Sequence, residues 1–337
     1  MTFRVFFTTA VILLINASPL TAQPFQLPTA NNAIFESGGE EKFFVGTVGK
    51  PWTSGTFGCV RSEGTQIHEG LDIRALQRDK QGESTDPVMA TADGVVTYVN
   101  RKSSLSTYGI YVVIRHQIEG IEIYSLYAHL REARADLKSG TPVKAKEAIG
   151  VVGRTANTRE GISKERAHLH FELNLLVNDN FSAWYKKNFP KQRNDHGQWN
   201  GQNLVGLDPR AIFLEQRKLG DKFSLLRFIQ ARKELCRVQV RDTDFPWVKR
   251  YKALIIPNPK AASEGTAGYE LALDFNAVPF QFTPRSESEL KSKSRYHLLS
   301  VNEAEQSQKP CRKLVAKKGG KWELTSQGQK ALDMLTY

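Results

Sequence analysis

Short runs of β-branched and aromatic residues, broken by turn residues, run through the first half of this 337-residue chain and limit how it can fold. Asp93-Gly94, Ser139-Gly140 and Thr141-Pro142 mark turns between these runs. The runs predict strands at residues 94–99, 109–115, 121–127, 148–152 and 168–173. Short strands at this spacing, without alternating helices, favour an antiparallel β-sheet or a barrel-like sandwich.

The length allows two domains, and the sequence changes character along the chain. Residues 23–42, rich in Gln, Pro and Asn, predict an irregular arm, and residues 43–215 hold the β-rich domain. Residues 216–337 predict a second, α+β domain of no recognised fold. Its expected elements are strands at 254–256, 269–274 and 296–301, a helix at 326–335, and a helix or strand at 223–232.

Residues 177–200 interrupt the strand pattern and look like an insertion. The segment sets five aromatic residues among Lys, Asn, Gln and Gly: Phe181, Trp184, Tyr185, Phe189 and Trp199. Two roles are open to it, ordinary packing over the sheet edge or a lid that contacts substrate.

The N-terminus has the three regions of a signal peptide. A positive charge at Arg4 precedes an apolar run at residues 5–15, and Leu20-Thr21-Ala22 offers a cleavage site. The apolar run is about half of the ~20 residues that a membrane-spanning helix needs. We therefore expect cleavage of residues 1–22 and a mature protein without stable membrane insertion. Its location would be the periplasm or otherwise the extracellular space and cell wall.

Export permits disulfide bonds, and the chain has three cysteines. Cys236 and Cys311 both lie in the second part of the chain, so we expect them to pair. Cys59 would then be a free thiol, either buried as a small apolar group or lying near His68.

The formal net charge of +12 favours anionic partners such as nucleic acid, lipid head groups or anionic glycans. From residue 201 onward, 24 Lys and Arg face 15 Asp and Glu, so most of the surplus lies in the second part. That part could bind an anionic wall polymer. Nucleic acid is a poor candidate for an exported protein that lacks an aromatic-basic recognition motif.

A pair of histidines in one predicted strand gives the first sign of a chemical site. In a strand, residues two apart share a face. His168 and His170 should therefore point the same way, with Leu169 and Phe171 directed to the opposite side and the core. Either histidine of the pair could bind a metal ion.

His68 and Asp72 offer two further ligands. On a straight strand they would lie ~13 Å apart, but Gly70 between them allows a bend. Two histidines and one carboxylate suit a catalytic zinc site with an open position for water. His129, at the end of a neighbouring predicted strand, and the remaining histidine of the pair would then be free to move protons or to stabilise charge.

Three motifs carry a resemblance to a known family: His68-Glu-Gly-Leu-Asp72, Tyr127-Ala-His129-Leu and His168-Leu-His170-Phe-Glu172. Together they resemble the lysostaphin-type (LytM-like) zinc peptidoglycan endopeptidases, over about residues 55–176 and again at 207–209. The resemblance implies that His68, Asp72 and His170 bind Zn²⁺ and that His129 and His168 form the catalytic pair. It also implies an antiparallel β-sheet with a groove.

The function implied by the resemblance is hydrolysis of peptide cross-links in bacterial peptidoglycan, with the peptide stems as partner. Relatives cleave Gly-Gly or D-amino-acid cross-links, and the sequence does not distinguish these. The alternative is a non-catalytic or weakly catalytic activator of other wall hydrolases. Because all five functional positions are occupied by the expected residue types, we expect an active enzyme.

Overall fold

The computed structural model describes residues 24–337, and within that range the strands form five sheets, in which neighbouring strands run antiparallel. The largest sheet has the order β12-β11-β7-β6-β5-β9, with β3 also paired to β11. Its strands are β3 (Leu71–Arg74), β5 (Gly94–Asn100), β6 (Ile110–Ile118), β7 (Ile121–Leu130), β9 (Pro142–Val143), β11 (His168–Leu176) and β12 (Leu204–Leu207). The predicted antiparallel β fold is therefore confirmed, and the largest sheet is open.

Two smaller sheets flank this one and complete the first part of the chain. They contain β1 (Gly58–Arg61) with β2 (Gln66–His68), and β4 (Pro87–Met89), β10 (Ala148–Val151) and β8 (Glu132–Ala133). The five strands expected from the sequence are present as β5, β6, β7, β10 and β11.

Strand β11 lies at the centre of the fold, and all nine of its residues are buried. Leu169 and Phe171 point into the main hydrophobic core, as their alternation predicts. Helix α3 (Pro209–Leu219) packs on that side, where the rings of Phe171 and Phe213 lie 6.0 Å apart. The Asp208 side chain caps this helix by accepting a hydrogen bond from the amide of Ala211. The opposite face of β11 is thus left for polar side chains.

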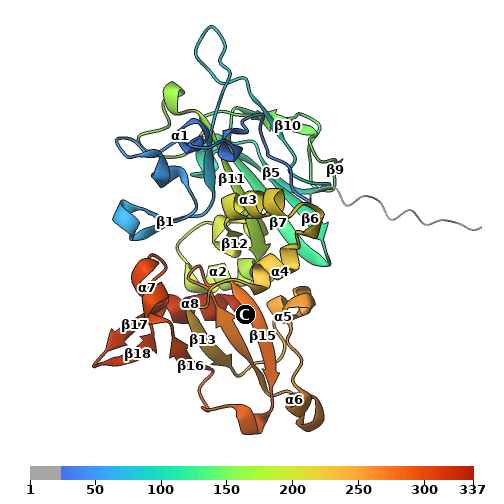
Figure 1. Ribbon diagram of the computed structural model, residues 1–337, viewed down its shortest axis with the longest axis vertical. Coiled ribbons are helices and arrows are strands. Elements are labelled where there is room, and N and C mark those ends of the chain that lie inside the picture. Colours follow the sequence, from blue (N-terminus) through green and yellow to red (C-terminus); the bar gives the residue numbers. More distant parts are fainter. Residues whose placement is uncertain (1–23) are drawn as a thin grey trace, which may run out of the picture.

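The second part of the chain combines an antiparallel sheet with short helices, as predicted, and lies below the first part in Figure 1. Its sheet has the order β15-β14-β13-β16. The elements are β13 (Cys236–Val240), β14 (Gly268–Leu273), β15 (Pro279–Arg285), β16 (Tyr296–Val301), the hairpin of β17 (Val315–Lys318) and β18 (Lys321–Leu324), α4 (Leu225–Gln230), α5 (Pro246–Arg250), α6 (Pro259–Glu264), α7 (Glu303–Gln308) and α8 (Ser326–Leu335).

One expected strand in this part is wrong. Residues 252–254 form a 3-10 turn, and Ile255 makes a single isolated bridge to Phe282. Pro257 and Pro259 follow at once and lack the amide hydrogens that a strand needs, so the apolar run ends there.

The aromatic insertion packs between the two parts of the chain. Helix α2 (Phe181–Asn188) buries Phe181 and Trp184 beside α8. The Trp184 indole donates a hydrogen bond to Asp333 at 3.1 Å, and the Lys330 ammonium lies 3.7 Å from the centre of the Phe189 ring. Of the two roles left open by the sequence, these contacts favour packing.

The arm before the first domain packs against that domain. Residues 33–35 form a 3-10 turn, and α1 (Glu40–Phe43) follows. Phe25 is buried, and its backbone exchanges two hydrogen bonds with the Gln216 side chain on α3. The expected signal peptide, residues 1–22, lies outside the described residues. From residue 24 to residue 337, no helix has both the length and the apolar character needed to cross a lipid bilayer.

The disulfide bond joins Cys59 to Cys311, whose Cα atoms lie 5.4 Å apart. The expected pair of Cys236 and Cys311 is therefore wrong. Cys236 is a fully buried thiol at the start of β13, between β14 and β16. The segment that carries Cys311 instead folds back onto β1, so the bond links the two parts of the chain.

Candidate metal centre and active site

Three side chains that lie far apart in the sequence converge at one end of β11. His170 on β11 is paired in register with Asp72 on β3, and His68 ends β2, with two residues between it and the start of β3. Gly70 forms the connection. A Cβ atom at this position would lie 2.3 Å from the Phe171 carbonyl oxygen, so only glycine lets the chain pass this close to β11.

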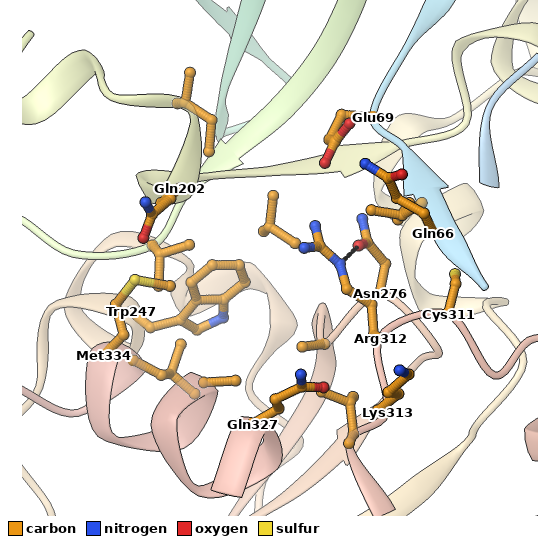
Figure 2. A pocket seen from close by; sticks show the side chains of 18 of the residues that line it. Gln66, Glu69, Gln202, Trp247, Asn276, Cys311, Arg312, Lys313, Gln327 and Met334 are labelled. Carbon is orange, nitrogen blue, oxygen red and sulfur yellow. Dashed lines mark hydrogen bonds between the residues drawn. The ribbon is translucent and has the colours of Figure 1, made fainter. Parts of the chain in front are cut away.

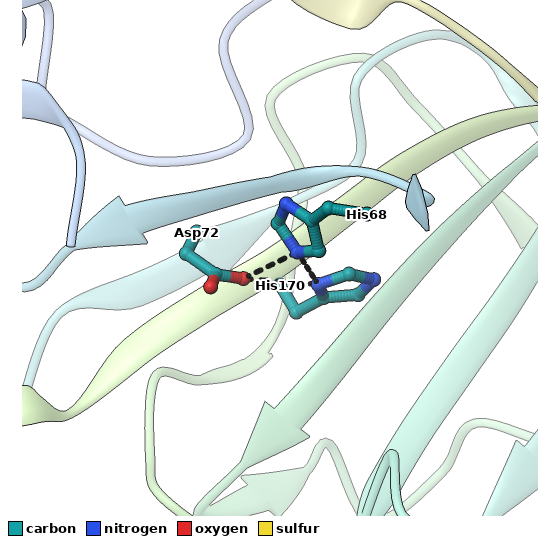
Figure 3. A group of neighbouring side chains, drawn as sticks. All are labelled: His68, Asp72 and His170. Carbon is teal, nitrogen blue, oxygen red and sulfur yellow. Dashed lines mark hydrogen bonds and ion pairs between the residues drawn. The ribbon is translucent and has the colours of Figure 1, made fainter. Parts of the chain in front are cut away.

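The nearest donor atoms of these three residues form a nearly equilateral triangle (Figure 3). His68 Nε2 lies 3.1 Å from Asp72 Oδ1 and 3.1 Å from His170 Nδ1, and the third side, His170 Nδ1 to Asp72 Oδ1, is 3.0 Å. Tetrahedral ligands with metal bonds of 2.0–2.1 Å would be separated by about 3.3–3.4 Å. The triangle is therefore close to one face of a tetrahedral metal site, and its three residues line a groove.

Hydrogen bonds on the far side of the His68 and His170 rings fix which nitrogen of each faces this triangle. His68 Nδ1 donates to the Thr56 carbonyl oxygen at 2.8 Å, which leaves Nε2 with its lone pair. His170 Nε2 donates to Glu172 Oε1 at 2.8 Å, which leaves Nδ1 with its lone pair. Metal-binding histidines are commonly oriented by an acceptor on the second nitrogen, and both histidines follow that rule.

Glu172 is the carboxylate behind His170, and both of its oxygens accept hydrogen bonds. Its Oε1 also accepts from the Tyr108 hydroxyl at 2.7 Å, and its Oε2 accepts from Asn174 Nδ2 at 2.7 Å. Burial alone would raise the pKa of Glu172, but these hydrogen bonds, led by the one from His170, lower it. The group therefore remains a carboxylate and keeps a negative charge behind the His170 ring.

The site favours a positive charge at its centre. Burial opposes charge on His170, but Asp72 and Glu172 outweigh it and raise the pKa of the imidazole. Burial likewise opposes the charge of Asp72, yet His68, His168 and His170 hold the pKa of that carboxyl well below its ordinary value. Arg61 on β1 binds the second oxygen of Asp72 and directs Oδ1 toward the histidines. One carboxylate, Asp72, thus faces the position that a cation would take, and a second, Glu172, lies behind the His170 ring.

His129 and His168 lie beside the triangle, with ring centres 5.0 Å apart. His129 Nδ1 donates to the Thr155 carbonyl oxygen at 2.9 Å, and His168 Nδ1 donates to that of Arg166 at 2.6 Å. Each ring therefore has Nε2 as its free nitrogen, and His168 Nε2 lies 3.5 Å from Asp72 Oδ1.

The backbone at His129 has a φ of 59°, in the left-handed region that non-glycine residues rarely adopt. Such strained positions gather at functional sites, where the surrounding structure holds them in place. Here the His129 amide donates to the Tyr108 carbonyl oxygen at 2.8 Å, which supports this conformation.

Both of these imidazoles are held in the neutral form. Burial, followed by repulsion from His168 and His170, lowers the pKa of His129 to about 3. Burial also lowers the pKa of His168, against the attraction of Asp72. Each neutral ring keeps the lone pair of its Nε2.

A groove of about 690 Å³ holds all five side chains proposed from the sequence. The other histidines of the chain, 116, 196 and 297, do not line it within the described residues. Four neighbours were not identified from the sequence: Thr56, Arg61, Tyr108 and Thr155. For Glu172 the signal was available, because it follows His170 by two residues and so shares its face of β11.

Comparisons with known proteins find a family match in the first part of the chain. Residues 66–181 match Peptidase family M23. The DD-carboxypeptidase/endopeptidase Mpg of Neisseria meningitidis serogroup B is 35% identical over 113 residues, which cover 33% of this chain and 20% of the relative. The protein of that name from Neisseria gonorrhoeae matches equally well. The matching region thus spans about a fifth of the length of these relatives.

Two solved structures illustrate the structural comparison. A putative glycyl-glycine endopeptidase lytM from Ruminococcus gnavus is 36% identical, with 32% of this chain and 39% of that chain covered and a TM-score of 0.25. The catalytic domain of lysostaphin from Staphylococcus simulans is 19% identical, with 48% and 87% covered and a TM-score of 0.29. Residues 66–181 are thus similar to Peptidase family M23, and the three motifs singled out in the sequence lie within the matched residues.

Proposed function

We propose that this protein is a zinc metalloendopeptidase that hydrolyses peptide cross-links of bacterial peptidoglycan. The observation that carries the proposal is the triangle of His68, Asp72 and His170 donor atoms, 3.0–3.1 Å apart, beside two neutral histidines in one groove. Two imidazoles, one carboxylate and an open corner are the donor set of a catalytic zinc site.

In this proposal the metal and the histidines have separate tasks. When bound, zinc supplies a Lewis acid for the scissile carbonyl and lowers the pKa of a water molecule. His129 or His168 would accept a proton from a water molecule in the groove through its free Nε2. The protonated ring then stabilises the developing negative charge or gives the proton to the leaving amine. Because the Nδ1 atoms are held by backbone carbonyl groups, both rings stay oriented throughout.

The substrate and location are part of the same proposal. The Neisseria relatives carry the name carboxypeptidase/endopeptidase, and the N-terminal sequence has the regions of an export signal. We place the protein in the periplasm or otherwise outside the cell, acting on peptide stems, with the basic second part facing anionic wall polymer. The alternative of a non-catalytic activator gains no support from a groove in which all five side chains are present.

The test is digestion of purified peptidoglycan by the mature protein, followed by mass spectrometry of the fragments. We expect new amino groups that are lost with a chelator, restored with zinc and lost in His170→Ala. His297→Ala is the matched control, because this histidine lies on β16, away from the groove. The activator function would be established instead if wild type and His170→Ala both released no fragments and both stimulated a partner hydrolase.

A further inference from the structure

A second cavity, of about 480 Å³, lies between the two parts of the chain (Figure 2). One wall comes from β2 and the turn before it, through Thr65, Gln66 and Glu69. The other wall comes from the second part, through Arg312 and helix α8 among others. Apolar side chains, including the fully buried Trp247, line the space between them.

This cavity continues into the groove of the metal centre. Glu69 follows the proposed ligand His68 directly and lines both spaces. A connecting cavity of about 640 Å³ is lined by Glu69, by Tyr108 from the groove and by Arg312 from the second cavity. A peptide bound at the metal centre can therefore extend over Tyr108 toward Arg312 without leaving the protein surface.

Arg312 presents an unsatisfied positive charge to this space. Its Nε donates to Asn276 Oδ1 at 2.7 Å, and Asn276 is fixed in turn by donating to the Gly206 carbonyl oxygen at 2.8 Å. Among residues 24–337, no carboxylate lies within 4.0 Å of the Arg312 guanidinium. The side chain is thus held in place while its remaining donors are available to a ligand.

The disulfide bond fixes this arginine relative to the metal centre. Cys311, the residue before Arg312, is bonded to Cys59 on β1. Strand β1 is paired with β2, where Gly58 lies opposite His68. A covalent bond and a short sheet therefore connect the Arg312 backbone to the strand that ends in a proposed zinc ligand.

Glu69 supplies the opposite charge on the opposite wall. Figure 2 shows its carboxylate across the cavity from Arg312. Within the described chain Glu69 has no ion-pair partner within 4.0 Å. Two opposite charges that face each other across a gap suit a ligand that carries both an ammonium group and a carboxylate.

We propose that this cavity is a subsite for a peptide end whose terminal residue carries both an ammonium group and a carboxylate, in which Arg312 binds the carboxylate and Glu69 binds the ammonium group. The inference rests on the proposed function, because that function identifies the peptide as one whose scissile bond lies in the adjoining groove. Residues of the second part, outside the region that matches family M23, would thereby select substrates by their charged end. A charge-assisted contact of this kind should change affinity at least about tenfold.

The test is calorimetric titration of the zinc-loaded, full-length protein with three probes: D-alanyl-D-alanine, its C-terminal amide and its N-acetyl derivative. We expect the free dipeptide to bind at least about tenfold more tightly than either derivative. Arg312→Gln should abolish the preference for the free carboxylate only, and Glu69→Gln should abolish the preference for the free amine only. Arg312→Lys, which keeps the charge without the planar fork, should retain part of the carboxylate preference.

Lys318→Gln is the matched control, because it removes a charge from the exposed β17–β18 hairpin outside the cavity. Equal affinity of wild type for the three probes, or discrimination that survives in Arg312→Gln, would overturn the proposal. The readout does not depend on cleavage. A protein that discriminates through Arg312 but releases no wall fragments refutes the proposed function and supports the subsite. A protein that cleaves without this discrimination refutes the subsite alone.

Discussion

Replacing Glu172 by Gln tests the electrostatic design of the metal centre without changing its shape. The carboxylate receives hydrogen bonds from His170, Tyr108 and Asn174 at 2.7–2.8 Å. In the Gln variant, Oε1 can still accept from His170 and Tyr108. Asn174 can rotate its amide to present Oδ1, which has no hydrogen-bond partner among residues 24–337. The hydrogen bonds are thus preserved, and only the negative charge behind His170 is lost.

Without that charge, His170 Nδ1 becomes a weaker ligand. Loss of a carboxylate of this kind typically lowers metal affinity by 10- to 100-fold, which corresponds to about 1.4–2.7 kcal/mol. We expect this weakening for zinc in Glu172→Gln, measured by competition with a chromophoric chelator at constant pH. The activity at saturating zinc should fall less than the affinity does, because His129 and His168 are untouched.

Glu305→Gln is the matched control, since this carboxylate is equally buried but lies on α7 beside Lys233 and Lys309. It should bind zinc as wild type does. An unchanged zinc affinity in Glu172→Gln would refute the claim that the negative charge of Glu172 strengthens the binding of zinc by His170. An equal loss in both variants would mean that the effect is a general destabilisation.

Four further outcomes follow from the structure. His129→Ala and His168→Ala should each lower kcat/KM at least about 10²-fold, while each variant still binds one equivalent of zinc. Loss of zinc from either variant would contradict the proposal that the replaced histidine acts on protons and does not bind the metal. Cys59→Ser should lower the free energy of unfolding by about 2–5 kcal/mol, as measured by urea denaturation. In the native protein, a thiol reagent should find no reactive group, because Cys236 is buried and burial raises the pKa of its thiol to about 12. After unfolding without reductant, the reagent should find one reactive thiol, that of Cys236. Trp184→Ala should cost about 3–5 kcal/mol of stability, whereas a raised KM at full stability would indicate a substrate lid.

The features that the sequence predicted well depend on local rules. The alternation of β11 placed His168 and His170 on one face and Leu169 and Phe171 on the other, because the pleat of a strand imposes a period of two. The bend at Gly70 was also predicted. The need for glycine at this position comes from the close approach to the Phe171 carbonyl oxygen, which belongs to a distant strand and has no local signal.

The features that the sequence did not predict depend on how distant segments dock. Pairing of Cys59 with Cys311 requires the second part to fold back onto β1, across a sequence separation of 252 residues. Arg61 and Thr155 reach the site through β1 and a loop, whose positions are set by tertiary contacts rather than by periodicity. The choice of His170 over His168 as metal ligand came from the family resemblance. In the structure, His170 Nδ1 belongs to the donor triangle and His168 Nε2 lies 3.5 Å from Asp72.

Diffraction from zinc-loaded crystals at the zinc absorption edge tests the central claim most directly. The account predicts one anomalous peak per chain, about 2.0–2.2 Å from His68 Nε2, Asp72 Oδ1 and His170 Nδ1. His129 and His168 should remain beyond bonding distance of the ion. A peak bonded to His168 or His129 in place of His170, or no peak in this groove, would contradict the account.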